Sequence, residues 1–154
     1  MGSFEPVDLL GLLRDVDLFE GLGDAELRAI SQLCHERTCA PGETITHQGE
    51  PGNELFIVAQ GLVEIVVAPS VAGSAPRAVV NLGRGQLFGE MALVDLGPRS
   101  ATVRAIAEGT RVQVIPREAF QVLCDAEPHL GYTVMRNMAA DLSFKLRHSH
   151  MSGR

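Results

Sequence analysis

The chain has 154 residues, of which 45% are hydrophobic and 21% charged, and its formal net charge is -6. This length and composition suit one soluble globular domain with a single core. The acidic balance argues against direct nucleic-acid binding, because a phosphate backbone is held by an excess of Lys and Arg. There is no apolar run of about 18 residues and no basic start before an apolar stretch, so no membrane span and no secretory signal are predicted.

The cysteines and histidines do not indicate a metal site. Cys34, Cys39 and Cys124 are widely spaced and form no C-x-x-C pair, which favours reduced thiols and a cytoplasmic location. The five histidines lack ligand spacing, so neither a metal ion nor a cofactor is predicted. Because no P-loop, HExxH motif or paired nucleophile and base is present, the chain is expected not to be an enzyme.

The N-terminal part is expected to be helical over about residues 6–36. Leucines at positions 9, 10, 12 and 13 form a short apolar patch, and residues 17–23 have the composition of a turn. From residue 24 to about 35, apolar residues recur with helical spacing at Leu27, Ile30 and Leu33.

Short β-rich runs separated by glycine and proline follow, over about residues 40–115. Many short strands at a spacing of roughly 8–12 residues favour a sandwich, a barrel or a jelly roll. The runs cover residues 44–46, 55–58, 62–67, 78–82, 101–106 and 111–115. The small and polar stretch 68–76 is typical of a flexible hairpin loop.

Two helices are predicted at the C-terminal end, over about residues 116–148. Pro116 suits the first position of a helix, and a longer helix is expected over about residues 128–147 after a break at 125–128. Its apolar positions alternate in steps of 3 and 4, at Tyr132, Met135, Ala139, Leu142 and Leu146. The simple interpretation is that this stripe packs on the barrel. The alternatives are that it closes over a ligand or pairs with a second chain.

One segment combines the residue types of an anion site, reading FGEMAL at 88–93 and PRSAT at 98–102. Gly89 lets the backbone come close to a bound group, and a short helical turn from Glu90 would present free N–H groups. Arg99 can contact a phosphate through two N–H groups, while Ser100 and Thr102 offer hydroxyls. The Glu90 carboxylate suits a ribose hydroxyl better than a phosphate.

These two motifs resemble the phosphate-binding cassette of cyclic-nucleotide-binding domains, as found in catabolite activator proteins, protein kinase A regulatory subunits and nucleotide-gated channels. Pro41-Gly42-Glu43, Gln48-Gly49-Glu50 and the run 55–58 leading to Gly61 are also similar to that family. The resemblance covers roughly residues 10–146. It implies an α+β fold, an antiparallel β jelly-roll barrel (double-stranded β-helix) flanked by N-terminal and C-terminal helices, as a single domain over residues 1–154.

The resemblance also implies a role for each site residue. Arg99 would pair with the cyclic phosphate, and Glu90 would accept a hydrogen bond from the ribose 2′-hydroxyl. The further ligand-binding positions are Phe88, Gly89, Met91, Ala92, Ser100 and Ala101. The base would stack on a residue of the C-terminal helix or of a partner chain, for which the candidates are Tyr132, Met135, Arg136 and Phe144.

The function implied is a stand-alone regulatory domain that binds cAMP, with cGMP as a weaker ligand, and shifts its helices on binding. The preference rests on Ser100, where cGMP-preferring relatives often carry threonine. The expected partners are the cyclic nucleotide, a second copy through the C-terminal helix, and a protein effector. The alternatives are a fragment or regulatory subunit of a larger transcription factor, channel or enzyme, and a ligand-free scaffold in which Glu90 and Arg99 form only a surface ion pair.

Overall fold

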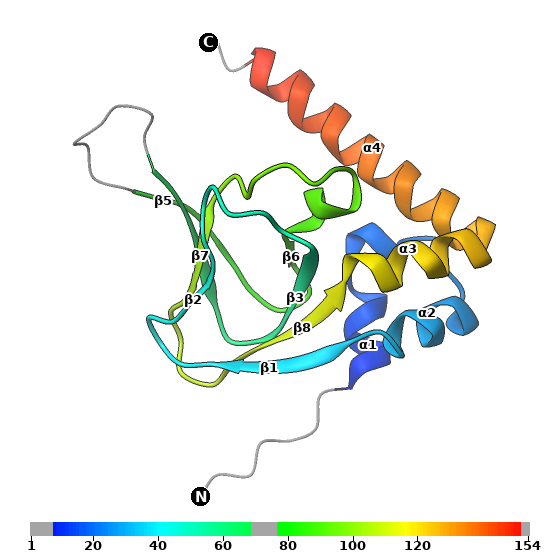
Figure 1. The fold of residues 1–154 in the computed structure, drawn as a ribbon, viewed down its shortest axis with the longest axis horizontal. Coiled ribbons are helices and arrows are strands. Elements are labelled where there is room, and N and C mark those ends of the chain that lie inside the picture. The colour runs from blue at the N-terminus through cyan, green and yellow to red at the C-terminus, as the bar shows by residue number, and fades with distance from the viewer. Residues whose placement is uncertain (1–7, 69–76, 152–154) are drawn as a thin grey trace, which may run out of the picture.

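The computed structural model describes residues 8–68 and 77–151, and places eight strands beside a group of helices (Figure 1). The strands are β1 (His35–Cys39), β2 (Thr44–Thr46), β3 (Glu54–Gln60), β4 (Val63–Val67), β5 (Arg77–Leu82), β6 (Leu87–Phe88), β7 (Thr102–Ala105) and β8 (Thr110–Pro116). They form two antiparallel sheets, with the orders β1-β8-β3-β6 and β2-β7-β4-β5. The expected α+β class with an antiparallel jelly roll is confirmed, although among the described residues no ladder closes the two sheets into one barrel.

The two sheets share a core that fills the space between their inner faces. Every strand contributes to it, through Cys39, Ile45, Phe56, Val58, Val63, Leu82, Phe88, Val103, Ala105 and Val112. Phe56 and Phe88, on paired strands, stack with their ring centroids 4.7 Å apart. The turn between β3 and β4 requires Gly61, because its φ of 87° is left-handed and a Cβ there would overlap Thr110.

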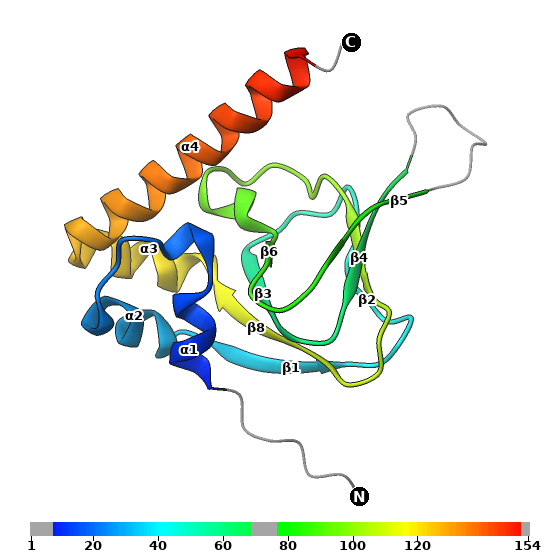
Figure 2. The same ribbon diagram turned by 180° about the vertical axis from the view of Figure 1, so that it is seen from behind.

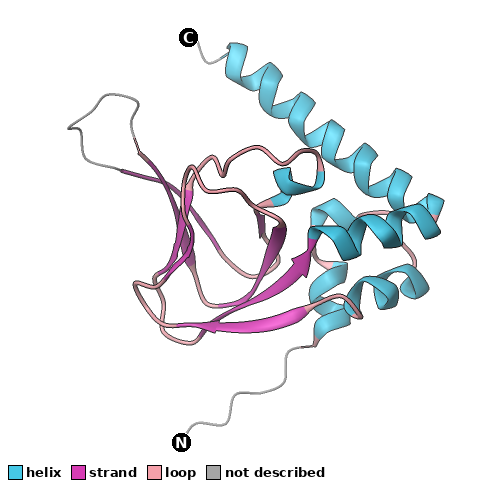
Figure 3. Cartoon of the chain, in the orientation of Figure 1, coloured by secondary structure: helices cyan, strands magenta, loops and turns pink. Residues whose placement is uncertain are grey.

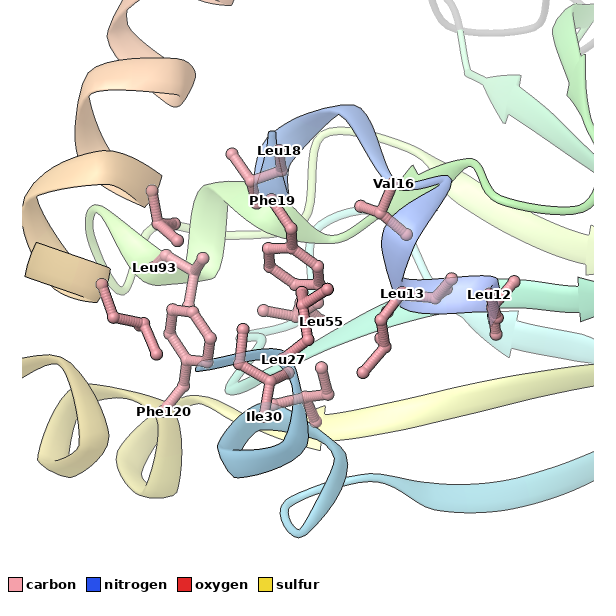
Figure 4. Close-up of a cluster of buried hydrophobic side chains, with 14 of the residues drawn as sticks. Leu12, Leu13, Val16, Leu18, Phe19, Leu27, Ile30, Leu55, Leu93 and Phe120 are labelled. Atoms are coloured by element: carbon pink, nitrogen blue, oxygen red, sulfur yellow. The ribbon is translucent and has the colours of Figure 1, made fainter. Parts of the chain in front are cut away.

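The helices gather at one end of the sheets (Figure 3). They are α1 (Leu9–Arg14), the 3₁₀ turn η1 (Asp17–Phe19), α2 (Asp24–Ser31), α3 (Arg117–Ala126) and α4 (Pro128–Met151), with a further 3₁₀ turn, η2 (Glu90–Leu93), between β6 and β7. A second core joins them to β3 and η2, where Phe19, Leu55, Leu93 and Phe120 converge (Figure 4). The turn η2 is therefore packed directly against the helical layer.

Helix α4 packs on this core only through its first half. Leu130, Val134 and Met138 are buried, and the Asn137 side chain donates hydrogen bonds to the carbonyls of Leu18 (2.9 Å) and Glu20 (2.8 Å). Residues 139–148 are all exposed, and this half extends beyond the other helices in both views (Figures 1 and 2). Among the described residues, no helix is both long and apolar enough to cross a membrane.

The interpretation that the predicted stripe of α4 packs on the barrel is wrong. Tyr132 is 67% exposed and Leu146 is 61% exposed, and the three residues between them on the stripe are exposed as well. The helix carries two apolar stripes, and the buried one runs through Leu130, Val134 and Met138. Spacing alone did not separate them, because both follow helical periodicity.

Two further expectations need correction at element boundaries. The chain enters strand β1 at His35, where a helix was expected to continue to about residue 36, and the strand pairs with β8 from His35↔Val114 to Cys39↔Thr110. Its sequence, HERTC, has almost no buried side chains, so it gives no apolar alternation to detect. Pro116 ends β8 and caps α3 instead of opening it. Strand β6 was not predicted, and the predicted hairpin loop falls largely on residues 69–76, outside the described residues.

The packing of α4 predicts unequal effects for two valine substitutions. Val134→Ala removes a fully buried side chain and should lower the free energy of unfolding by about 2 kcal/mol. Val122→Ala, at a side chain that is 66% exposed, should change it by less than about 0.5 kcal/mol. Urea denaturation followed by circular dichroism measures both, and equal losses would contradict this assignment of the buried face.

Candidate functional site

A cavity of about 670 Å³ opens between the sheet β2-β7-β4-β5, the turn η2 and helix α4. All eight predicted ligand-binding residues line it, namely Phe88, Gly89, Glu90, Met91, Ala92, Arg99, Ser100 and Ala101. The structure thus brings the two sequence motifs together around one space. Its volume lies within the range usual for small-molecule sites, about 300–1,000 Å³.

Gly89 sets the direction in which the chain enters η2. Its φ of 78° is left-handed, and a Cβ there would lie 3.0 Å from the Glu54 carbonyl oxygen and 2.6 Å from Nη1 of Arg99. Only glycine fits both the conformation and the space. The expected short helical turn is present, and its Glu90 and Met91 amides precede the first intrahelical bond, which joins the Ala92 amide to the Gly89 carbonyl (3.1 Å).

Arg99 is held at the cavity wall by its backbone. Its amide donates to the Glu50 carbonyl (2.8 Å), and its carbonyl accepts from the Gly49 amide (2.8 Å). The chain around residue 99 is thereby paired with the turn that follows β2. The Arg99 backbone is consequently positioned by its hydrogen bonds to residues 49 and 50.

The Arg99 side chain is half-buried and bonded to backbone carbonyls. Nη2 donates to the Glu54 carbonyl (2.9 Å) and Nη1 to the Gly89 carbonyl (3.4 Å), while the guanidinium carbon lies 5.6 Å from the Phe56 ring centroid. Burial lowers the pKa of the Arg99 guanidinium and the Glu54 carboxylate opposes that shift, yet an arginine keeps its proton in a protein. The cavity therefore holds a permanent cation.

Glu90 does not neutralise this cation. Arg99 bonds to carbonyls, and across residues 8–68 and 77–151 the Glu90 carboxylate takes part in no ion pair or hydrogen bond. The alternative of a surface ion pair between the two residues is therefore not what the structure contains. Arg99 and Glu90 thus line the same cavity without a bond to each other.

The hydroxyls predicted beside the arginine differ in availability. Ser100 is exposed at the cavity. The Thr102 hydroxyl instead accepts a hydrogen bond from the Gln48 amide (2.9 Å) and stabilises the pairing of the two segments. Only Ser100 of these two is placed to contact a bound molecule.

The residues of α4 that reach the cavity are not the four proposed to stack on a base. Met138, Asp141, Leu142 and Lys145 line it, with Asp141 and Lys145 forming an ion pair of 2.9 Å. Their spacing of i, i+3, i+4 and i+7 places them on one helix face, and this spacing was the signal that sequence reasoning missed.

The proposed base-stacking candidates lie elsewhere on the helix. Tyr132 and Met135 line a separate groove beside Leu93 and the α3–α4 junction. Arg136 is exposed, and Phe144 contacts His148 with ring centroids 3.9 Å apart. Stacking by these residues stays a prediction for a rearranged helix or a partner chain.

The remaining wall of the cavity is mainly apolar and comes mostly from the strands. Its strand residues are Thr46, Ile65, Val80, Leu82, Leu87 and Val103, and the loop residues Gly52, Asp95, Gly97 and Pro98 complete it. All of these strand positions except Leu87 were predicted as strand residues, but none was predicted as a site residue, because alternation along a strand does not say which face borders a cavity. Among the described residues, no group of three His, Cys, Asp or Glu side chains is placed to hold a metal ion.

This arrangement suits a small ligand that carries an anion, hydroxyl groups and a flat apolar part. The Arg99 cation, the first residues of η2 and the Glu90 carboxylate line the cavity together with apolar side chains of the sheet and of α4. The class is that of a domain with a cavity for a small molecule and a cation at the cavity wall. Comparison with known proteins gives the family, because the family model for the cyclic nucleotide-binding domain matches residues 36–127. The chain belongs to the cyclic nucleotide-binding domain family.

Individual relatives agree with this assignment. The chain is 40% identical over 122 residues to a cyclic nucleotide-gated potassium channel of Mesorhizobium japonicum, covering 78% of this chain and 31% of the channel. The crystal structure of Thermus thermophilus catabolite activator protein superposes with a TM-score of 0.77 at 34% identity, covering 88% of this chain and 61% of that one. The regulatory domain of Toxoplasma gondii PKA, solved with cAMP, gives a TM-score of 0.73 at 26% identity, covering 88% and 48%. The chain spans about a third of the channel relatives that it matches.

The contact between Gly52 and Arg99 predicts a selective loss of binding. A Cβ at Gly52 would overlap the Arg99 guanidinium, so Gly52→Ala should displace this group from the Glu54 carbonyl and weaken cyclic-nucleotide binding about tenfold or more. Calorimetric titration measures the affinity. The control is Gly83→Ala, whose Cβ would have no neighbour closer than 3.8 Å. Wild-type affinity in Gly52→Ala would contradict this account.

Proposed function

We propose that this chain binds cAMP in the cavity described above, in preference to cGMP, and acts as a regulatory input domain. The observation that carries the proposal is that Arg99 and Glu90 line the same cavity but are not bonded to each other. Such a pair leaves a cation for the phosphate and a carboxylate for the ribose. The Toxoplasma gondii domain, solved with cAMP, supports the choice of ligand.

The proposed ligand uses each part of the cavity for a different group. The cyclic phosphate takes the Arg99 guanidinium and the first amides of η2, and the ribose 2′-hydroxyl donates to Glu90. The purine lies among the apolar strand residues below α4. The exposed Ser100 hydroxyl is a weaker match than threonine to the guanine amino group, and this supports the preference for cAMP.

Binding is proposed to reach the helices through η2. Leu93, the last residue of this turn, is buried in the core that also contains Phe120 of α3 and Val134 of α4. A close-packed core transmits a displacement of one member to its neighbours. A ligand that draws η2 toward its phosphate therefore changes how α3 and α4 pack against this turn. Such a change is a shift between two packed arrangements of the helices.

The output is proposed to lie in a larger assembly. The relatives include channels and protein kinase regulatory subunits of which this chain matches only a part. The same input domain would serve a channel, a transcription regulator or a kinase, or act as a separate subunit that docks on such an effector. The chain is proposed to contribute ligand sensing and no catalytic step of its own.

We further propose that the exposed stripe of α4 pairs with a second copy of the chain. The side chains of this stripe are all exposed, at Tyr132, Met135, Ala139, Leu142 and Leu146, although Leu142 also borders the cavity. Their alternating steps of 3 and 4 match the seam along which two helices pack. The observation that favours this over simple packing is that another stripe, through Leu130 and Val134, already attaches α4 to its own domain.

Removal of the phosphate-binding cation tests the main proposal. Arg99→Ala should weaken cAMP binding by at least tenfold, because hydrogen bonds to a charged group contribute about 1.5–3 kcal/mol each. Isothermal titration with cAMP and with cGMP, on protein shown to be free of retained nucleotide, gives the affinity and the ratio of the two ligands. Arg104→Ala, which removes a neighbouring arginine bonded to Glu64 and not lining the cavity, is the control. No saturable heat with either ligand on the folded wild type would refute the proposal.

A charge placed on the exposed stripe tests the dimer. Leu146→Glu should shift the chain to a monomer, since a carboxylate in the seam would be desolvated without a partner. Sedimentation equilibrium over a range of concentrations measures the association. Ala140→Glu, at an exposed position of α4 off the stripe, should leave it unchanged. A wild-type chain that stays monomeric at every concentration would show that the stripe has another role.

A further inference from the structure

Two arginines hold the two ends of η2. At the start of the turn, Nη1 of Arg99 donates to the Gly89 carbonyl (3.4 Å). At its end, Nε of Arg117 donates to the Ala92 carbonyl in a short hydrogen bond. A cation at the carbonyl end of a helical turn is favourable, because the last carbonyls lack intrahelical donors.

The same two arginines also bind consecutive residues at the start of β3. Nη2 of Arg99 donates to the Glu54 carbonyl (2.9 Å), and the backbone amide of Arg117 donates to the Asn53 carbonyl (2.8 Å). The four contacts form a closed circuit that runs from Arg99 through η2 to Arg117 and back along residues 53–54. This circuit connects the phosphate-binding arginine to Arg117, the first residue of α3.

Arg117 differs from Arg99 in its relation to the cavity. It does not line the cavity, so it contacts no ligand there. It also forms no ion pair with any carboxylate in the described ranges. Its side chain is partly buried, and the Ala92 carbonyl is the group that it contacts.

We infer that Arg117 is a positioning residue for the phosphate-binding turn, acting through the Ala92 carbonyl. This inference rests on the proposed function, in which the Arg99 guanidinium binds the ligand phosphate. The phosphate then competes with the Gly89 carbonyl for the N–H groups of Arg99. Arg117 faces no such competition. Arg117 keeps the end of η2 attached to the first residue of α3. The amides of the turn therefore stay oriented toward the cavity, and a movement of η2 is passed to α3.

Amide hydrogen exchange in the ligand-free full chain tests this without assuming any ligand. Arg117→Ala should speed exchange about tenfold or more at the Ala92, Val94 and Asp95 amides, which bond within and just after η2. Arg117→Lys, which keeps the charge and one donor, should restore part of the protection. Arg37→Ala is the control, since Arg37 lies on β1 and pairs with Glu43 away from the cavity. The melting temperature of each variant is measured by thermal denaturation.

Titration with cAMP supplies the second measurement, in which Arg117→Ala should bind about tenfold more weakly and Arg117→Lys should recover most of the loss. If exchange in the turn rises while even the wild type binds no cyclic nucleotide, the inference stands and the proposed function fails. If the wild type binds and Arg117→Ala matches it in affinity and in exchange at the turn, the inference is overturned. Faster exchange spread equally over β1 and α4, with a lower melting temperature, would show a merely structural role and would also overturn it.

Discussion

The structure around the cavity depends on one half-buried cation, Arg99, whose side chain is bonded to backbone carbonyls. Arg99 is half-buried, and a charge in such a place is stable only when its donors are satisfied. The Glu54 and Gly89 carbonyls each accept a hydrogen bond from one of these donors, and they come from β3 and from the residue that follows β6, two strands that are also paired with each other. Gly52 and Gly89 lack side chains where the guanidinium lies against them. The guanidinium thus adds side-chain bonds between chain segments that already lie together, and Gly52 and Gly89 leave the room that it occupies.

The fold could be predicted from the sequence wherever local patterning and long-range packing agree. Strands β2, β3, β4, β5, β7 and β8 follow apolar runs bounded by glycine or proline, and each lies near its predicted position. Strand β1 escaped because it is a polar edge strand that exists through its pairing with β8. The buried face of α4 was not predicted for a different reason. Leu130 and Val134 form one apolar stripe, and the exposed stripe is equally regular. Periodicity establishes a helix but does not say which of two apolar stripes meets the core.

The candidate site likewise has residues that the sequence predicts and residues that it does not. The cassette is contiguous in sequence and its chemistry is carried by residue type, so Gly89, Glu90 and Arg99 could be found without a structure. All of them line the cavity. The apolar wall and the α4 contribution are assembled from six separate elements, and only the packed chain brings Ile65 and Met138 to the same space. The carbonyl partners of Arg99 and Arg117 could not be predicted at all, because every residue has a carbonyl and no side-chain identity marks the ones used.

Helix α4 presents one face to the cavity and another to the outside, and Leu142 belongs to both. The free energies of binding at these two faces of one helix are thermodynamically linked. A protein that docks on the outer face and prefers one position of the helix changes the occupancy of the cavity, and the cavity's occupant changes the docking equilibrium by the same factor. In the presence of such a docked protein, the measured ligand affinity would depend on the identity and the concentration of that protein.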